Sequence, residues 1–261
     1  MIDAHCHLEH MEDPDDVIYH AKKTGMSAIV TSIADIKDRE KVIALKKKHP
    51  DFVFICLGFH PEIMGKYNAN DIEEYINFIR QNKKWISAIG EVGTDYNWLP
   101  KSEDQARSQI IFEKFIELSK ELNLPLVIHS RNGRDNIEGS NDGIADAIEI
   151  LKNNRCRDVM MHCFSGNETQ LKTCLEQGWT ISFATVLVKS FKHQRLAKQT
   201  PLDQMVLETD SPWLDPDSRE LVNRPWKIER SAEILATLLN IDKDEILRIT
   251  EKNARRFFRM S

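Results

Sequence analysis

The sequence predicts an α/β protein, a single (β/α)8 TIM barrel with a metal site at the carboxyl ends of its strands. Eight short apolar segments typical of buried strands alternate with helical patterns, at roughly 20–40 residues per unit. No GxGxxG pattern follows the first segment, which disfavours a doubly wound open sheet. The 261 residues contain no linker, low-complexity stretch or change in composition. We therefore expect residues 1–261 to form one domain, a size common for such barrels.

The strand-like segments are short and apolar along their whole length, which is typical of strands buried on both faces of a parallel sheet. They begin near Ile2, Ser27, Phe52, Ile86, Leu126, Val159, Thr180 and Met205.

Between these segments, apolar residues recur at helical spacing. The spacing predicts helices over 15–23, 37–48, 71–81, 102–122, 143–153, 168–177, 189–199, 225–240 and 242–258. Helix-breaking residues support the boundaries: Pro14 and Gly25 flank the first helix, Pro50 follows the second and Pro125 follows the fourth.

Composition and charge exclude several classes of protein. The net charge of −5 and the lack of a long basic run argue against non-specific duplex binding through a positive face. A nuclease that binds a short piece of strand is still compatible, because bound divalent ions would supply positive charge. With no leader pattern, no membrane-spanning run and five scattered cysteines, we expect a cytoplasmic protein with buried, reduced thiols. We expect no membrane association and no protein partner.

The first strand-like segment contains a pair of histidines, in Asp3-Ala4-His5-Cys6-His7. Alternate residues of a strand point to the same face, so His5 and His7 would share one face and Cys6 would point away. Two imidazoles beside an acid favour a divalent metal site. The alternative is one surface histidine and one that hydrogen-bonds in the core, and this short pattern alone does not decide.

Five later strand-like segments also end in a histidine or an acid. The residues are His60, Glu91, His129, His162 and Asp210. Each alone is compatible with a capped strand or an opened turn. The carboxyl ends of parallel barrel strands meet at one rim, where the active sites of such barrels lie. Together with the histidine pair, these residues therefore predict a metal centre at that rim.

These motifs, in this order, resemble those of the TatD family, metal-dependent deoxyribonucleases in the amidohydrolase superfamily of (β/α)8 barrels. The matching segments are 3–7, 58–61, 90–96, 128–131, 162–166, 208–214 and 253–257, so the resemblance extends from residue 2 to residue 257. The resemblance implies two divalent ions, and Mg²⁺, Mn²⁺ and Zn²⁺ all suit the ligands. It assigns His5, His7 and Asp210 to one ion, His129 and His162 to the other, and Glu91 to a bridging position.

Two stretches depart from the family pattern. Residues 132–143 form a longer and more polar loop than is usual there, and Arg224 occupies the middle of the Asn223-Arg224-Pro225 turn. Both lie near the expected substrate side, so they bear on substrate preference and not on the metal ligands.

The expected reaction is hydrolysis of DNA phosphodiester bonds, exonucleolytic and on single-stranded DNA. A hydroxide that bridges the two ions would attack phosphorus, with Glu91 as the bridge and Asp210 as the proton acceptor. His60 would donate to a phosphate oxygen or orient a ligand, and the alternative is that it fixes the turn before Pro61.

Three residues are expected to contact the substrate. Arg131 would bind a phosphate through both arms of its guanidinium, or would instead pair with Asp95 or Glu208. Trp98 and Trp213 would stack on bases, although packing beneath the rim loops explains such aromatic residues equally well.

Two other functions stay open on the sequence alone. The same ligands would serve an amidohydrolase, lactonase or phosphotriesterase that acts on a small molecule, because a bridging hydroxide also attacks carbonyl carbon. A non-catalytic metal-binding module is the third reading, and the complete ligand set counts against it.

Overall fold

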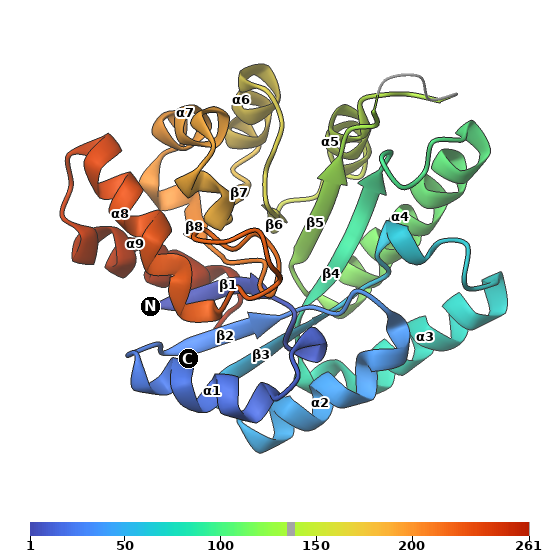
Figure 1. Cartoon of the computed structure of the whole chain (residues 1–261). Helices are drawn as coiled ribbons and strands as arrows, with labels where there is room; N and C mark the ends of the chain where they lie inside the picture. Colours follow the sequence, from blue (N-terminus) through green and yellow to red (C-terminus); the bar gives the residue numbers. More distant parts are fainter. Residues whose placement is uncertain (135–138, 261) are drawn as a thin grey trace.

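The computed structural model, which describes residues 1–134 and 139–260, has the predicted barrel architecture (Figure 1). Eight parallel strands form one sheet in the order β1 to β8, with helices on its outer side. The strands are β1 (Ile2–Cys6), β2 (Ala28–Thr31), β3 (Val53–Leu57), β4 (Ile86–Asp95), β5 (Leu126–Arg131), β6 (Val159–Met161), β7 (Thr180–Phe183) and β8 (Met205–Leu207). Each begins within one residue of its predicted position.

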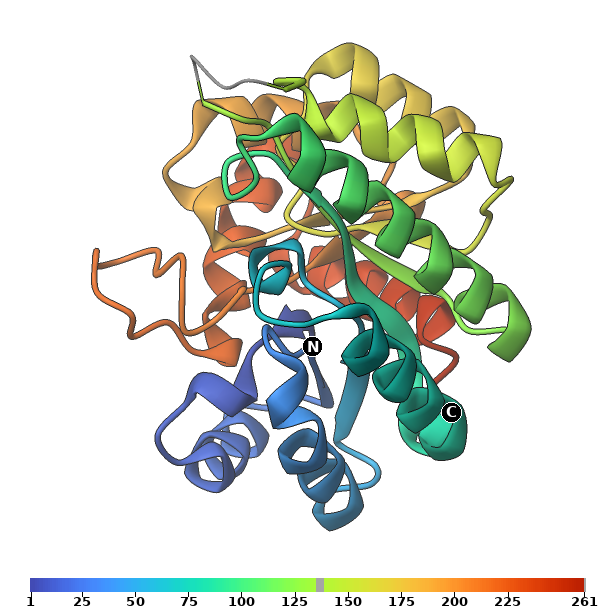
Figure 2. The same cartoon turned by 90° about the vertical axis from the view of Figure 1, so that its right-hand side faces the viewer.

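The predicted helices are also present. They are α1 (Pro14–Lys23), α2 (Arg39–Lys48), α3 (Ala69–Asn82), α4 (Ser102–Leu122), α5 (Gly143–Asn153), α6 (Glu168–Glu176), α7 (Phe191–Gln199), α8 (Ile228–Leu239) and α9 (Lys243–Phe257). Short 3-10 helices over Ile36–Asp38 and Pro225–Lys227 take up the first residues of the helices predicted over 37–48 and 225–240. Figure 2 shows α3, α4 and α5, coloured from teal to yellow-green, side by side along the outside of the barrel.

Local hydrogen bonding explains why α3 begins before its predicted start. Asn68 Oδ1 accepts the backbone N–H groups of Asn70 and Asp71 at 2.8 and 3.1 Å. The Asp71 carboxylate in turn accepts the Asn68 N–H at 2.8 Å, which completes a capping box. The cap satisfies backbone donors at the helix start, so the helix includes residues that lie before its first apolar position.

The apolar core has two layers, one inside the barrel and one between the sheet and the helices. The inner layer is built from mostly small side chains on the strands, namely Ile2, Ala4, Ala28, Val30, Cys56, Ala88, Val127, Met160 and Val206. Ala254, Phe258 and Met260 join this layer from the end of α9, so the C-terminal segment closes the amino end of the barrel. At the carboxyl end of the barrel, polar side chains take the place of this apolar layer.

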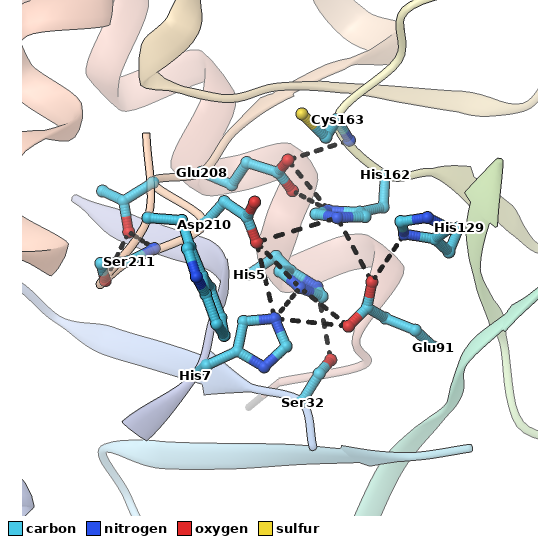
Figure 3. A network of polar contacts seen from close by, with 12 residues as sticks. His5, His7, Ser32, Glu91, His129, His162, Cys163, Glu208, Asp210 and Ser211 are labelled. Atoms are coloured by element: carbon cyan, nitrogen blue, oxygen red, sulfur yellow. Dashed lines mark hydrogen bonds and ion pairs between the residues drawn. The ribbon is translucent and has the colours of Figure 1, made fainter. Parts of the chain in front are cut away.

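A register shift in β1 directs the two histidines toward the carboxyl rim. Ala4 belongs to the inner core layer, whereas Cys6 belongs to the outer one, although strict alternation would put both on one face. The pairing of β1 with β2 shifts between Asp3 and Cys6, which accounts for the change. His5 and His7 consequently point into a shared polar cluster (Figure 3). Cys6 points away from it into the outer core layer, as the sequence predicted.

Hydrogen bonds at the carboxyl rim close the barrel between β8 and β1. The N–H of Asp210 donates to the His5 carbonyl at 3.0 Å, and the N–H of His7 donates to the Ser211 carbonyl at 2.8 Å. The buried Asp3 carboxylate accepts both the N–H and the hydroxyl of Thr209, at 2.9 and 2.5 Å. The contacts that close the sheet therefore also fix the backbone of three predicted ligands.

Thr209→Val tests the contribution of this closure to stability. The change removes the hydroxyl that donates to buried Asp3 and leaves a carboxylate oxygen without that donor, so we expect a loss of about 1–3 kcal/mol in the free energy of unfolding. Denaturant unfolding measures the loss. The exposed Thr237→Val on α8 is the control, with an expected change within about 0.5 kcal/mol. Equal stabilities of the two variants would contradict this account of the closure.

Four cysteines, Cys6, Cys56, Cys156 and Cys174, are buried and Cys163 is half-buried, so the prediction of mostly buried thiols is confirmed. In the described parts of the chain, no helix is both long enough and apolar enough to cross a membrane.

Candidate metal centre

The six predicted metal ligands lie together at the carboxyl ends of the strands (Figure 3). Glu91 is at their centre and has one carboxylate oxygen for each side of the cluster. Its Oε1 is 3.3 Å from His7 Nε2 and 3.5 Å from His5 Nε2. Its Oε2 is 3.2 Å from His129 Nδ1 and 3.4 Å from His162 Nε2. This division matches the bridging position that the family resemblance implies for Glu91.

Asp210 completes the half of the cluster that contains the histidine pair. Its Oδ1 is 3.5 Å from His7 Nε2 and 3.7 Å from His5 Nε2. These three side chains form one of the groups whose ligand atoms are close enough to share an ion. The backbone of Asp210 has a φ of +56°, a left-handed conformation that Asp and Asn tolerate better than most residues.

Two features of the cluster indicate that it is built for cations. His5 Nε2 and His7 Nε2 face each other at 3.2 Å, and Glu91 Oε1 is buried with no hydrogen-bond donor among the described residues. Inward-facing imidazole nitrogens and a buried carboxylate oxygen without a donor are the ligands that divalent metals use. The residues present therefore fit the expected divalent ions.

Each of the four histidines predicted as ligands has a polar partner on its other ring nitrogen. His7 Nδ1 contacts Glu9 at 3.0 Å, and His5 Nδ1 contacts the Ser32 hydroxyl at 3.3 Å. An acceptor on one nitrogen keeps the proton there and leaves the lone pair of the other nitrogen for a metal. Sequence reasoning missed both partners. Ser32 directly follows β2, and a serine gives no metal-ligand signal of its own.

The other two ligand histidines have carboxylate partners. His162 Nδ1 contacts Glu208 at 3.0 Å, and Glu208 also accepts the N–H of Cys163 at 2.9 Å. His129 Nε2 contacts Asp95 Oδ2 at 2.8 Å. As a result His129 faces the centre through Nδ1, whereas His5, His7 and His162 face it through Nε2.

The pKa values of Glu91 and Asp210, the two carboxylates among the predicted ligands, lie below their usual values. Burial by itself would raise the pKa of Glu91, but His5 and His162 outweigh it and hold that pKa well below its usual value. Burial would lower the pKa of His129, but hydrogen bonds to Asp95 and Glu91 raise it to about 10. The carboxylates therefore favour positive charge within the cluster, and a bound cation would compete with imidazole protons for the same positions.

His60 lies beside the cluster and is suited to donate a hydrogen bond. It belongs to a group with Glu91 and His129 that is close enough to share an ion, and its Nε2 is 4.0 Å from Glu91 Oε2. Its Nδ1 accepts the N–H of Glu62 at 3.2 Å, which leaves the proton of a neutral ring on Nε2. Burial and the charge of His129 hold the pKa of His60 at about 3, so the ring is neutral.

A cavity of about 420 Å³ lies over the cluster and contains the three residues predicted to contact substrate. Trp98 is 50% exposed, and the ring of Trp213 packs edge-on against His7 at 4.8 Å. Arg131 lines the cavity as well, but its Nε and Nη2 pair with Asp95 at 3.0 and 2.8 Å. Of the two roles that the sequence left open for Arg131, the ion pair is the one present here.

The two stretches that depart from the family pattern both adjoin this rim. In the segment 132–143, the N–H of Gly133 donates to the Asn141 carbonyl at 2.9 Å, and residues 135–138 lie outside the described residues. The amide of Asn223 donates to the carbonyls of Trp213 and Thr209 at 2.7 and 2.9 Å. The Asn223 turn therefore holds the loop after β8 in place beside the cavity.

Glu208→Gln tests how the partner of His162 supports the centre. The amide has one carbonyl oxygen in place of two carboxylate oxygens and no charge, so we expect metal affinity to fall by about 10- to 100-fold while the protein stays folded. Equilibrium metal titration of chelator-treated protein measures the change. Glu149→Gln, which alters an exposed glutamate on α5, is the control. Wild-type affinity in Glu208→Gln would contradict the supporting role.

Known proteins match the chain over its whole length. Residues 2–259 match the family described as TatD related DNase. The human deoxyribonuclease TATDN3 is 32% identical over 99% of this chain and 94% of its own length. A metal-dependent hydrolase of Methanocaldococcus jannaschii is 33% identical over 99% of this chain and 96% of its own.

Solved structures share the fold. A TatD homologue from Escherichia coli K12 superposes with a TM-score of 0.87 at 22% identity, covering 100% of this chain and 98% of that one. A TatD-family hydrolase of Entamoeba histolytica gives a TM-score of 0.86 at 20% identity, with the same coverage. With the match of the whole sequence, the chain belongs to the TatD-related DNase family of metal-dependent hydrolases.

Proposed function

We propose that this protein is a deoxyribonuclease that hydrolyses DNA phosphodiester bonds with two divalent ions, which share Glu91. The observation that carries the proposal is the arrangement around Glu91. One carboxylate oxygen faces His5 and His7, and the other faces His129 and His162. The name of the human relative, a deoxyribonuclease, supports DNA as the substrate.

The side chains of the cluster would divide the chemical work. His5, His7 and Asp210 would hold one ion, and His129 and His162 the other. Divalent ions bound by these residues would supply an activated water at neutral pH and would polarise a phosphoryl oxygen. Asp210 directs Oδ1 toward the imidazoles, so Oδ2 would accept the proton of the attacking water.

His60 would donate its Nε2 proton in a hydrogen bond to an oxygen of the scissile phosphate. The backbone N–H of Glu62 on Nδ1 supports this orientation. A neutral donor fits a site that already holds several positive charges, because a further cation would weaken the binding of the ions.

The walls of the cavity would bind the DNA strand. Trp98 and Trp213 offer aromatic surface on which unpaired bases would stack, at about 1–3 kcal/mol per base. The Nη1 of Arg131, which is not part of its pair with Asp95, would contact a phosphate oxygen. A deep centre within a cavity of about 420 Å³ suits the end of a single strand, so we propose exonucleolytic attack on single-stranded DNA.

Metal-restored cleavage tests this function. Chelator-treated protein is incubated with an end-labelled single-stranded DNA oligonucleotide, alone and with Mg²⁺, Mn²⁺ or Zn²⁺. We expect cleavage to return with at least one ion and to give a ladder of products that shortens progressively from one end. Folded protein that takes up metal but cleaves no DNA with any ion would contradict the proposal and would favour a small-molecule substrate.

A further inference from the structure

The cavity over the metal centre extends to two lysines that the sequence analysis did not single out. Lys37 lies in the 3-10 helix after β2, and Lys66 lies in the segment between β3 and α3. Both line the same cavity as Glu91 and Asp210. Segments that are far apart in sequence thus bring two ammonium groups to one side of the cavity.

Asp35 holds the two lysines beside each other. Its side chain is 9% exposed, and its Oδ1 already accepts the Tyr67 hydroxyl at 2.5 Å and the backbone N–H of Lys37 at 3.2 Å. Its Oδ2 is left for the two ammonium groups, with Lys66 Nζ at 3.4 Å and Lys37 Nζ at 3.7 Å. One carboxylate therefore faces two positive charges, and this group of three side chains carries a net positive charge.

Both ammonium groups have donors left for a ligand. The lysine side chains are 69% and 57% exposed, and their distances to Asp35 are longer than those of strong charge-assisted hydrogen bonds. Each ammonium has three N–H donors, and its ion pair with Asp35 is made through one oxygen, Oδ2. Arg131 differs, because two nitrogens of its guanidinium are already paired with Asp95.

We propose that Lys37 and Lys66 form a binding site for a phosphate of the nucleic-acid strand other than the phosphate being hydrolysed. This inference rests on the proposed nuclease function and assigns residues by which the site would favour oligonucleotides over small phosphate esters. Lysine binds phosphate as a point charge and does not require one fixed geometry. A second phosphate held at this wall would keep the strand in place while the bond at the metal centre is cleaved.

The double variant Lys37→Gln/Lys66→Gln tests the site with two substrates. One is a single-stranded DNA oligonucleotide, and the other is bis(p-nitrophenyl) phosphate, a diester with no second phosphate. We expect KM for the oligonucleotide to rise. We also expect the ratio of kcat/KM for the oligonucleotide to kcat/KM for the small diester to fall at least about fivefold. We also expect the slope of log KM against log salt concentration to decrease by about one. Lys37→Arg/Lys66→Arg should restore most of the affinity.

Two further variants make the test specific. Lys83→Gln/Lys84→Gln removes the same charge from exposed residues before β4, at the opposite end of the barrel, and should leave the ratio at its wild-type value. Glu62→Gln removes an exposed acid from the wall of the same cavity, and should lower KM for the oligonucleotide. Opposite changes in KM, a rise in Lys37→Gln/Lys66→Gln and a fall in Glu62→Gln, would not follow from a general loss of stability.

The outcomes separate this inference from the function on which it rests. If the wild type cleaves the oligonucleotide and the lysine double variant keeps both its KM and its salt dependence, the phosphate site is wrong and the nuclease function stands. If the metal-loaded wild type hydrolyses the small diester but no oligonucleotide, both are wrong. If the double variant loses activity on both substrates in equal proportion, the lysines support the fold and do not select the substrate.

Discussion

If the proposed two-ion centre is right, Glu91→Gln is expected to abolish hydrolysis and to prevent the binding of both ions. The carboxylate of Glu91 is the group that lies within 3.5 Å of imidazole nitrogens on both sides of the cluster. An amide has no charge and places an NH₂ group against one half of the ligands. Mutation of a group that only supports a metal ligand lowers metal affinity or activity by about 10- to 100-fold. Mutation of a bridging ligand should therefore lower both metal affinity and kcat/KM by more than about 100-fold.

Metal analysis after gel filtration and DNA cleavage rates measure these two losses. Glu113→Gln, an exposed change on α4, should retain the metal content and rate of the wild type. Unfolding curves establish that Glu91→Gln is folded. A folded variant that keeps its metal and cleaves DNA at an appreciable rate would show that Glu91 does not hold the ions.

Asp210→Asn is expected to separate metal binding from catalysis. Asparagine keeps one oxygen for the ion that His5 and His7 would hold, and it tolerates the left-handed backbone at this position. It cannot accept the proton of the attacking water as a carboxylate does. We therefore expect weaker binding of one ion, which excess metal overcomes, and a fall of about 10²- to 10⁴-fold in kcat, which excess metal does not overcome.

Cleavage rates over a series of metal concentrations distinguish the two effects. Asp203→Asn, an exposed aspartate at the opposite end of β8, is the matched control and should behave as the wild type. Full recovery of kcat in Asp210→Asn at high metal concentration would leave Asp210 as a ligand only and would require another proton acceptor.

The cluster of candidate metal ligands could be predicted from the sequence because the fold brings their positions together. Each candidate ligand lies in the carboxyl half of an apolar strand or shortly after one, and in a parallel barrel those ends converge whatever the lengths of the connecting helices. The same rule also places Ser32, which follows β2 and contacts His5. This residue was missed because a serine gives no metal-ligand signal of its own.

Side-chain orientation could not be predicted, because it depends on partners that are distant in sequence. Arg131 pairs with Asp95, across neighbouring strands, and Asp95 also determines which nitrogen of His129 faces the cluster. His60 becomes a donor because a backbone N–H in the next turn occupies its other nitrogen. The lysine pair was missed for a related reason. Exposed lysines in loops follow no periodic pattern, and only the shared contact with Asp35 in the folded structure brings these two together.

The number of ions bound per chain tests the central claim most directly. Chelator-treated wild type and Glu91→Gln are titrated with Mn²⁺ or Zn²⁺ under equilibrium conditions, and the bound metal is measured. A centre that Glu91 bridges predicts two ions per wild-type chain, and a concerted loss of both in Glu91→Gln. Saturation at a single ion, or a variant that loses one ion and keeps the other with wild-type affinity, would contradict it.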